Sequence, residues 1–359
     1  MLRIGIVGLA QTGKSTLFDI LTRAHAAAHG GGKAEAHVGV VRVPDARLDR
    51  LAELFHPQKT IHATVEYLDT PGSIIDLTRA GVQSQSLREL NALAHVVRAF
   101  EDPATAAVGA VNPAGDIENV ELELILSDLA VVEKRVERLE KDVKKQKNPA
   151  LEKELQVLKV SKSSLEKQVP LRDAALTADD ERVIRGFTFL SLKPMLYVLN
   201  LGEKDAGRAN AAEQFAQQAG LKQRPHTAVA AICGKVEAEL AELDDSEAAE
   251  FLASYGLEES AIFRLIRASY QLLGLISFFT VGEDECRAWT IRAGTSALEA
   301  AGEIHTDLER GFIRAEVVKY DDLLAAGGLA EARARAQLRL EGKDYIVRDG
   351  EIVHIRHSG

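Results

Sequence analysis

The sequence contains few of the features that define several large classes of protein. Only two cysteines, Cys233 and Cys286, occur in 359 residues, which is too few for a disulfide framework. No stretch approaches the ~18 consecutive apolar residues that span a bilayer. Residues 1–7 enter a short apolar strand pattern at once and do not read as a signal peptide. We therefore expect a cytoplasmic protein without membrane contact.

An excess of positive charge is also missing. Lys and Arg total 44 against 54 Asp and Glu, so the formal net charge is −10. This balance argues against a protein coated in nucleic acid, although a local basic patch remains possible. The hydrophobic share of 46% and the charged share of 27% are ordinary for a folded protein. The length exceeds the ~250 residues of most single cores, which predicts two or three domains.

Short apolar runs alternate with helix-like stretches through much of the chain. This alternation predicts a mainly parallel sheet covered by helices on both faces. The expected strands are Ile4–Val7, Val38–Val43, Thr64–Leu68, Ala94–Phe100, Met195–Leu199 and Thr227–Ala231.

A long interval between the fourth and fifth expected strands has a different periodicity. Apolar residues from Leu122 to Val143 recur at spacings of three and four, as in a coiled coil. Asn148-Pro149 interrupts the series, which resumes from Leu151 to Val169 with Lys162 at a skipped position. Residues 131–168 carry eleven Lys and Arg against seven Asp and Glu, a local charge of +4. We expect an inserted helical hairpin with a basic tip near residue 147.

The C-terminal part has the pattern of a separate small α+β domain. A helical run, Glu258–Leu273, precedes a strand-rich segment that opens at Phe278. Near its end, Asp349-Gly350 lies between two apolar alternations, which is typical of a β-hairpin turn.

The strongest chemical signal follows the first expected strand and precedes a helical segment. Gly8-Leu9-Ala10-Gln11-Thr12-Gly13-Lys14-Ser15-Thr16 has the spacing of a phosphate-binding P-loop. In such loops backbone N–H groups surround the phosphates, the lysine reaches the β- and γ-phosphate oxygens, and the serine hydroxyl binds Mg²⁺. The predicted phosphate-binding residues are Gly8, Gln11, Thr12, Gly13, Lys14, Ser15 and Thr16.

A second element follows the third expected strand, where the sequence reads Asp69-Thr70-Pro71-Gly72. P-loop hydrolases place an aspartate here to hold Mg²⁺ through water, and the glycine amide meets the γ-phosphate. Taken alone, this tetrapeptide is also an ordinary turn. After a P-loop, we predict that Asp69 and Ser15 are metal ligands and that Gly72 contacts phosphate.

Two further loops are candidates for binding the base. The fifth strand ends in Asn200-Leu201-Gly202-Glu203, where guanine-specific relatives of this class have Asn-Lys-x-Asp. Losing the Lys and Asp weakens the case for guanine and makes adenine plausible, whereas Asn200 could simply cap a helix. The sixth strand is followed by Cys233-Gly234-Lys235, in the loop that normally closes over the base. Lys235 could line the ring or be a plain surface lysine.

Together these segments resemble the YchF/Obg-like ATPase family of translation-associated P-loop NTPases. The resemblance covers nearly the whole chain and rests on the P-loop, on Val38–Asp49, on the Asn-x-x-Glu at Asn200 and Glu203, and on the tail. In the tail it rests on Arg287–Ile291, Ile304–Asp307, Arg310–Glu316 and Leu340–Tyr345.

The resemblance implies three domains, Mg²⁺ as the cofactor, and the ribosome or RNA as a partner. The fold class it implies is α/β, a P-loop G domain with an inserted antiparallel helical hairpin and a C-terminal β-grasp (TGS-like) domain. On this basis we assign residues 1–120 and 186–277 to the G domain, 121–185 to the hairpin, and 278–359 to the TGS-like domain.

The chain departs from the family pattern at the phosphate end of the site. Leu9–Thr12 replaces the family's Leu-Pro-Asn-Val, and the switch segment Gly31–Ala36 has no threonine. Ser73 follows Gly72 in a remodelled second switch, and a family histidine aligns with Ala107. No catalytic residue can therefore be assigned, and we predict very slow turnover.

Three functions remain open on the sequence. The first is a slow ATP- or GTP-hydrolysing switch on the translation machinery. The second is a nucleotide-binding adaptor that no longer hydrolyses, and the third, ranked last, is a small-molecule kinase. His25, His29 and His37 could be imagined as metal ligands, but no cysteine or carboxylate cluster accompanies them, so we assign them no metal.

Overall fold

A computed structural model describes residues 2–23, 37–70, 72–79, 84–103, 109–208 and 210–358. The chain divides into two compact units. The first comprises Met1–Val40 and Glu66–Ala268, and the second comprises Val41–Val65 and Ser269–Gly359. Within the described ranges, no helix combines the length and the apolar composition needed to cross a lipid bilayer.

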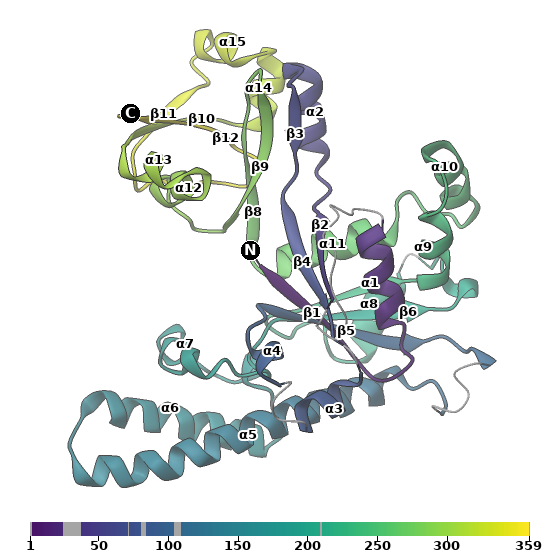
Figure 1. The fold of residues 1–359 in the computed structure, drawn as a ribbon, viewed down its shortest axis with the longest axis vertical. Helices are drawn as coiled ribbons and strands as arrows, with labels where there is room; N and C mark the ends of the chain where they lie inside the picture. The colour runs from purple at the N-terminus through teal and green to yellow at the C-terminus, as the bar shows by residue number, and fades with distance from the viewer. Residues whose placement is uncertain are drawn as a thin grey trace. The chain divides into compact units, whose positions relative to one another are not determined.

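A six-stranded sheet with the strand order β2-β4-β1-β5-β6-β7 organises the first unit (Figure 1). Strand β1 pairs in parallel with β4 and β5, β5 with β6, and β6 with β7. Every residue of β6 is buried, as the nearly continuous apolar run predicts for an inner parallel strand. All six expected strands are found: β1 (Arg3–Val7), β2 (His37–Arg42), β4 (Thr64–Asp69), β5 (Ala92–Ala99), β6 (Met195–Leu201) and β7 (Thr227–Ile232).

Helices connect these strands, as a parallel sheet requires. One core cluster packs residues of β5 and β6 against residues of helices on one face, including Leu93, Tyr197, Leu124 and Leu87. The α-helices of this unit outside the hairpin are α1 (Lys14–Arg23), α3 (Ile74–Arg79), α4 (Ser84–Arg88), α7 (Ala178–Ile184), α8 (Ala211–Gln218), α9 (Gly234–Leu240), α10 (Asp245–Ser254) and α11 (Ala261–Leu272), which continues into the second unit.

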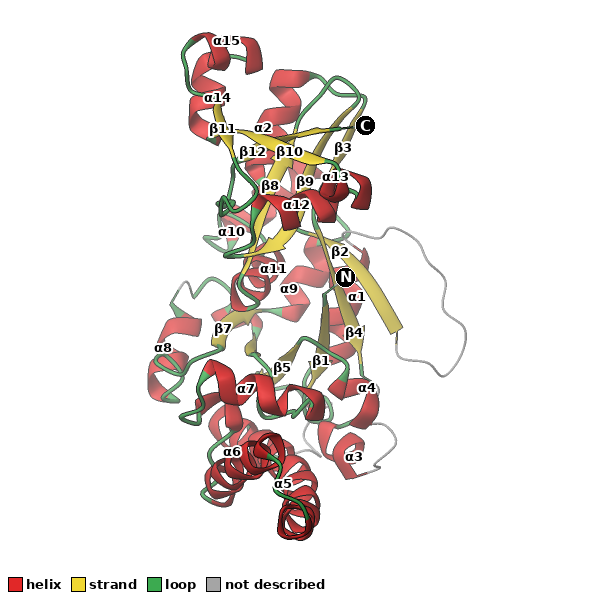
Figure 2. Cartoon of the chain, turned by 90° about the vertical axis from the view of Figure 1, so that its left-hand side faces the viewer, coloured by secondary structure: helices red, strands yellow, loops and turns green. Residues whose placement is uncertain are grey.

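The predicted helical hairpin is present as α5 (Pro113–Lys145) and α6 (Pro149–Glu166), seen nearly end-on in Figure 2. Asn148 turns the chain, because its side chain accepts a hydrogen bond from the Ala150 amide and Pro149 starts the next helix. The two helices share an apolar core. Lys162, at the skipped core position, pairs with Glu133 at 3.1 Å.

The second unit contains another six-stranded sheet, with the order β11-β10-β12-β8-β9-β3. Its strands β8 and β12 are parallel, and the pairs β8–β9, β10–β12 and β10–β11 are antiparallel. Helix α12 packs its alanines into the core on one face. This β-grasp arrangement consists of α2 (Ala46–Phe55), β3 (Lys59–Ile61), β8 (Leu275–Thr280), β9 (Glu285–Arg292), α12 (Ala297–Ile304), α13 (Thr306–Arg310), β10 (Phe312–Val318), α14 (Tyr320–Ala326), α15 (Leu329–Ala334), β11 (Arg339–Glu341) and β12 (Ile352–His357).

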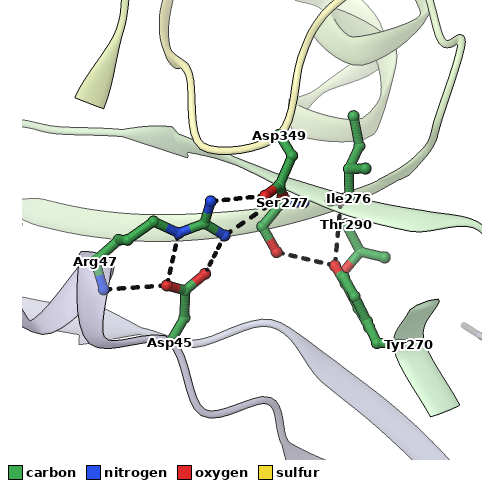
Figure 3. Close-up of polar contacts among 7 residues, drawn as sticks. All are labelled: Asp45, Arg47, Tyr270, Ile276, Ser277, Thr290 and Asp349. Atoms are coloured by element: carbon green, nitrogen blue, oxygen red, sulfur yellow. Dashed lines mark hydrogen bonds and ion pairs between the residues drawn. The ribbon is translucent and has the colours of Figure 1, made fainter. Parts of the chain in front are cut away.

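The N-terminal segment Val41–Val65 is built into this second unit. Its strand β3 pairs in parallel with β9, and Arg47 is held between two carboxylates (Figure 3). The Arg47 guanidinium donates to Asp45 at 2.7 Å and to Asp349 at 2.7 Å. Asp349 also accepts a hydrogen bond from the Ser277 amide at 2.9 Å. The predicted boundaries placed this segment in the G domain, whereas these contacts attach it to the C-terminal sheet.

The hairpin predicted at Asp349-Gly350 is wrong in one respect. The turn exists, with Gly350 at φ +81°, and β12 follows it. The residues before the turn do not form a strand, since Ile346 makes only an isolated bridge, to Ser296. Strand β12, after the turn, pairs with β10 and β8 instead. The Asp349 side chain binds Arg47 and the Ser277 amide, so the turn joins three segments of the unit.

Candidate nucleotide-binding site

The P-loop lies between β1 and α1 and has the backbone that its glycines predict. Gly8 and Gly13 have φ of +152° and +94°. A Cβ on Gly8 would lie 2.6 Å from the Val96 carbonyl oxygen, and one on Gly13 would lie 2.4 Å from the Asn200 side-chain amide. Only glycine fits at these two positions, because both the backbone angle and the space exclude a side chain.

Lys14 lies at the first residue of α1 and folds back over the loop. Its ammonium group donates to the Leu9 carbonyl oxygen at 2.6 Å, and the residue is 8% exposed. Burial lowers the pKa of Lys14, and the nearby Asp69 carboxylate opposes that shift. Negatively charged phosphate oxygens beside Lys14 would compensate for the loss of hydration of its buried ammonium group.

Ser15 and Asp69 meet although 54 residues separate them in the sequence. The Ser15 hydroxyl donates to one carboxylate oxygen of Asp69 at 3.2 Å. The other carboxylate oxygen of Asp69 is buried and has no hydrogen-bond partner. A hydroxyl and a carboxylate are hard oxygen ligands of the kind that Mg²⁺ prefers, and a buried oxygen without a partner fits a position beside a cation or its water. The residues predicted to hold the metal therefore fit it.

Gly72 and the second switch continue from Asp69. Gly72 is exposed with φ +86°, and the Ile74 amide donates to the Gly8 carbonyl oxygen at 3.1 Å. The Ser73 hydroxyl accepts from the Ile75 amide at 3.3 Å and so caps the start of α3. This switch is thus tied directly to the P-loop.

Asn200 joins the P-loop to the loop after β7. Its side-chain amide donates to the Thr12 carbonyl oxygen at 3.0 Å and accepts from the Gly234 amide at 3.0 Å. Because Gly234 is the first residue of α9, the Asn200 side chain satisfies one of the free N–H groups at the start of that helix. Its amide therefore links the P-loop to the loop that contains predicted base residues.

The other predicted base residues differ in exposure. Leu201 and Cys233 are buried, and burial raises the pKa of the Cys233 thiol. Glu203 and Lys235 are exposed and form an ion pair at 2.7 Å. A cavity of about 580 Å³ along β7 is lined by Leu201 and Cys233 but by no P-loop residue. The charged side chains at the base end are thus exposed, whereas Lys14 and Asp69 at the phosphate end are buried.

His95 is a residue that sequence reasoning missed. It lies on β5 in register with Val7, and a Cβ on Gly8 would be 3.5 Å from its ring. The side chain is completely buried, and neither ring nitrogen has a hydrogen-bond partner. Burial, together with the positive charges of Lys14 and Arg172, lowers the pKa of His95 to about 3. The only signal in the sequence was one histidine inside an apolar strand.

Several predicted features fall outside the described residues. They are Gly31–Ala36 of the first switch, Pro71, Ala107, and the histidines His25 and His29. Among the residues that are described, no three His, Cys, Asp or Glu side chains group as a metal site.

Comparisons with known proteins point to one family. Residues 275–358 match the family model YchF-GTPase_C, described as a protein of unknown function (DUF933). The chain is 42% identical to the "Ribosome-binding ATPase YchF" of Bacillus subtilis over 99% of both chains, and 42% identical to that of Escherichia coli O157:H7 over 98% of both. The solved Schizosaccharomyces pombe YchF GTPase has a TM-score of 0.86 and 30% identity, covering 99% of this chain and 97% of that one.

Proposed function

The chain belongs to the YchF family, and from this premise we propose that it is a ribosome-associated P-loop ATPase or GTPase with slow turnover. The observation that carries the proposal is the meeting of Lys14, Ser15 and Asp69 at one end of the sheet, because each supplies a group that triphosphate binding needs. The whole-length likeness to relatives named ribosome-binding ATPases supports the partner. A ribosomal partner implies a cytoplasmic protein.

Each residue has a separate task in this proposal. When a triphosphate binds, the Lys14 ammonium group leaves the Leu9 carbonyl oxygen and binds β- and γ-phosphate oxygens instead. Ser15 and Asp69 would hold Mg²⁺, and the Gly72 amide would face the γ-phosphate. Magnesium, when bound, supplies positive charge at the phosphate oxygens. The Asn200 amide keeps the P-loop and the Gly234 loop at a fixed separation, so that a base can lie between Leu201 and Lys235.

A titration of purified protein with ATP and GTP, with and without Mg²⁺, tests the binding part. We expect saturable triphosphate binding that Mg²⁺ strengthens. Single-turnover hydrolysis then separates the switch from the non-hydrolysing adaptor, since Ser73 stands where some P-loop hydrolases use a glutamine. A wild-type rate equal to that of Lys14→Ala, even with ribosomes added, would favour the adaptor.

The contact with the ribosome is proposed to lie at the hairpin tip. Lys141, Lys144, Lys145 and Lys147 are exposed there, and of these only Lys141 has an ion-pair partner within the described part of the chain, Glu137 at 2.6 Å. Lysine side chains without ion-pair partners are well suited to bind RNA phosphates. Binding of this kind has an affinity that falls as the salt concentration rises.

Charge reversal tests this contact. Replacing Lys144, Lys145 and Lys147 by Glu is expected to weaken ribosome co-sedimentation. It is also expected to make the dependence of log affinity on log salt shallower, with a slope smaller in magnitude by about 2. The matched control changes three exposed lysines elsewhere, Lys204, Lys222 and Lys319, to Glu. Equal losses in both triple variants, or an unchanged slope in the first, would return the hairpin to a structural role.

A further inference from the structure

The second switch and the root of the helical hairpin share one apolar core. Ile74 of α3 and Leu87 beside Arg88 of α4 are fully buried in the same cluster as Ile117, Val120 and Leu124 of α5. Close packing of this kind transmits displacement, because well-packed side chains leave little space to absorb it. The helix that follows Asp69 and Gly72 therefore rests directly on the first helix of the hairpin.

One end of this packed region is attached to the phosphate site. The Ile74 amide donates to the Gly8 carbonyl oxygen at 3.1 Å, and Asp69 accepts a hydrogen bond from Ser15. A rearrangement of the P-loop or of the Asp69 carboxylate thus acts on the first residue of α3.

The other end is attached to the hairpin by a buried carboxylate. Arg88, the last residue of α4, donates to Asp128 at 3.0 Å and to the Ser127 hydroxyl at 3.1 Å. Asp128 lies on α5, is completely buried, and also accepts from the Leu190 and Ser191 amides at 3.0 and 2.7 Å. The helix that enters the hairpin and the segment that returns from it are therefore held at one side chain.

Beyond Asp128 the hairpin is braced as a single body. Arg135 forms a two-pronged pair with Glu154 at 2.7 and 3.0 Å, and Lys159 pairs with Glu140 at 2.7 Å. From Asp128 to Lys145 the helix extends roughly 26 Å at ~1.5 Å per residue, so a rotation of about 10° at the root would move the tip by roughly 4–5 Å.

We propose that Arg88 and Asp128 are positioning residues that couple the second switch to the hairpin, so that the bound nucleotide sets where the basic tip lies. This inference rests on the proposed function, because it requires a triphosphate at the P-loop. Its content is regulatory: the ribosome contact at the tip is controlled from the phosphate site through α3, α4 and the Arg88–Asp128 pair.

A distance measurement within the first unit tests the proposal in the full chain. Spin labels are attached at Lys147→Cys on the tip and Gln218→Cys on α8, since both positions are exposed and the native Cys233 and Cys286 are buried. The distance between the two labels is measured by double electron–electron resonance, once with ADP and once with a non-hydrolysable ATP analogue plus Mg²⁺. We expect the distance to differ by several ångströms between the two nucleotides.

Variants locate the coupling. Arg88→Ala is expected to abolish the nucleotide-dependent change in distance while ATP affinity changes by less than about threefold. Arg88→Lys keeps the charge but not the forked guanidinium, and it is expected to reduce the change in distance. The matched control Arg135→Ala removes an ion pair farther along the same hairpin and is expected to keep the shift. If Arg88→Ala does not fold, Arg88→Lys together with Ser127→Ala replaces it.

The outcomes separate this inference from the proposed function. Saturated ATP binding with no distance change, or a full shift in the Arg88 variants, overturns the coupling and leaves the ATPase proposal intact. Absence of triphosphate binding in the wild type overturns the ATPase proposal and the coupling with it. A shift lost equally in Arg135→Ala would assign the effect to the hairpin as a whole and overturn the role of Arg88.

Discussion

The charged side chains at the phosphate end and at the base end of the site lie in opposite environments. Lys14 and Asp69 are almost completely buried at the phosphate end. Glu203 and Lys235 at the base end have 44% and 63% of their side chains exposed and already bind each other. Charges act more strongly where water is excluded, whereas exposed pairs contribute little. We therefore expect affinity to come mainly from the triphosphate and selection of the base to be weak.

The largest expected effect is the loss of Lys14. No other P-loop side chain brings a full positive charge to the phosphates, so Lys14→Ala is expected to weaken triphosphate binding by more than ~100-fold, about 2.7 kcal/mol. Calorimetric titration measures this, with circular dichroism to confirm folding. Lys235→Ala, which removes an exposed lysine at the base end, is the matched control and should change affinity only slightly. Equal losses in the two variants would contradict the comparison.

The next effect concerns His95 beneath the P-loop. Its pKa is lowered to about 3 by burial, whereas an unfolded histidine titrates near 6.5. Between these values the unfolded chain binds a proton that the folded chain does not, so stability is lost as the pH falls below 6.5. This group alone is expected to lower the free energy of unfolding by about 2 kcal/mol between pH 7.5 and 5.

Urea denaturation of the wild type and of His95→Gln at several pH values measures that contribution. The variant is expected to show the shallower dependence on pH, whatever its absolute stability. Parallel curves for the two proteins would mean that His95 does not titrate as its burial requires.

A smaller effect is expected for Ser15→Ala. Only the metal position is lost, so affinity in EDTA should be close to that of the wild type, while the strengthening by Mg²⁺, about tenfold or 1.4 kcal/mol, should disappear. The same titration with and without Mg²⁺ measures both numbers. If the variant lost as much affinity in EDTA as in Mg²⁺, Ser15 would have a role other than metal binding.

The smallest effect is expected at the base end. We expect ATP to bind at least as well as GTP, and Glu203→Ala to change either affinity by less than about threefold, since an exposed ion pair contributes at most ~1 kcal/mol. Competition between labelled ATP and unlabelled GTP measures the preference. A ~100-fold preference for GTP, equivalent to about 2.7 kcal/mol, would show that these residues select the base after all.

The parts of the molecule that were predictable are those in which local pattern and tertiary structure agree. The P-loop has a strand before it, a helix after it and glycines whose φ no other residue adopts easily, so its geometry is fixed over a few residues. The hairpin was predictable for the same reason, because its apolar repeat and Asn148-Pro149 specify two helices and a turn within one continuous segment.

The features that escaped prediction depend on contacts between distant segments. Asp349-Gly350 has the composition of a hairpin turn, but its carboxylate is used by Arg47 and Ser277, and the strand after it pairs elsewhere. His95 is one polar residue in an apolar strand, and its burial under the P-loop depends on the register of β1 against β5. Neither outcome is encoded in a short window of sequence.

The incorporation of Val41–Val65 into the C-terminal sheet has a consequence for biosynthesis. Arg47 leaves the ribosome 302 residues before Asp349, and β3 is made long before its partner β9. At an elongation rate of ~5–20 residues per second, the early segment waits roughly 15–60 s for the residues that complete its sheet. The second unit therefore becomes foldable only after Asp349 and β12 have been synthesised. A nascent chain halted after the first unit carries a length of polypeptide that has not yet met its partners.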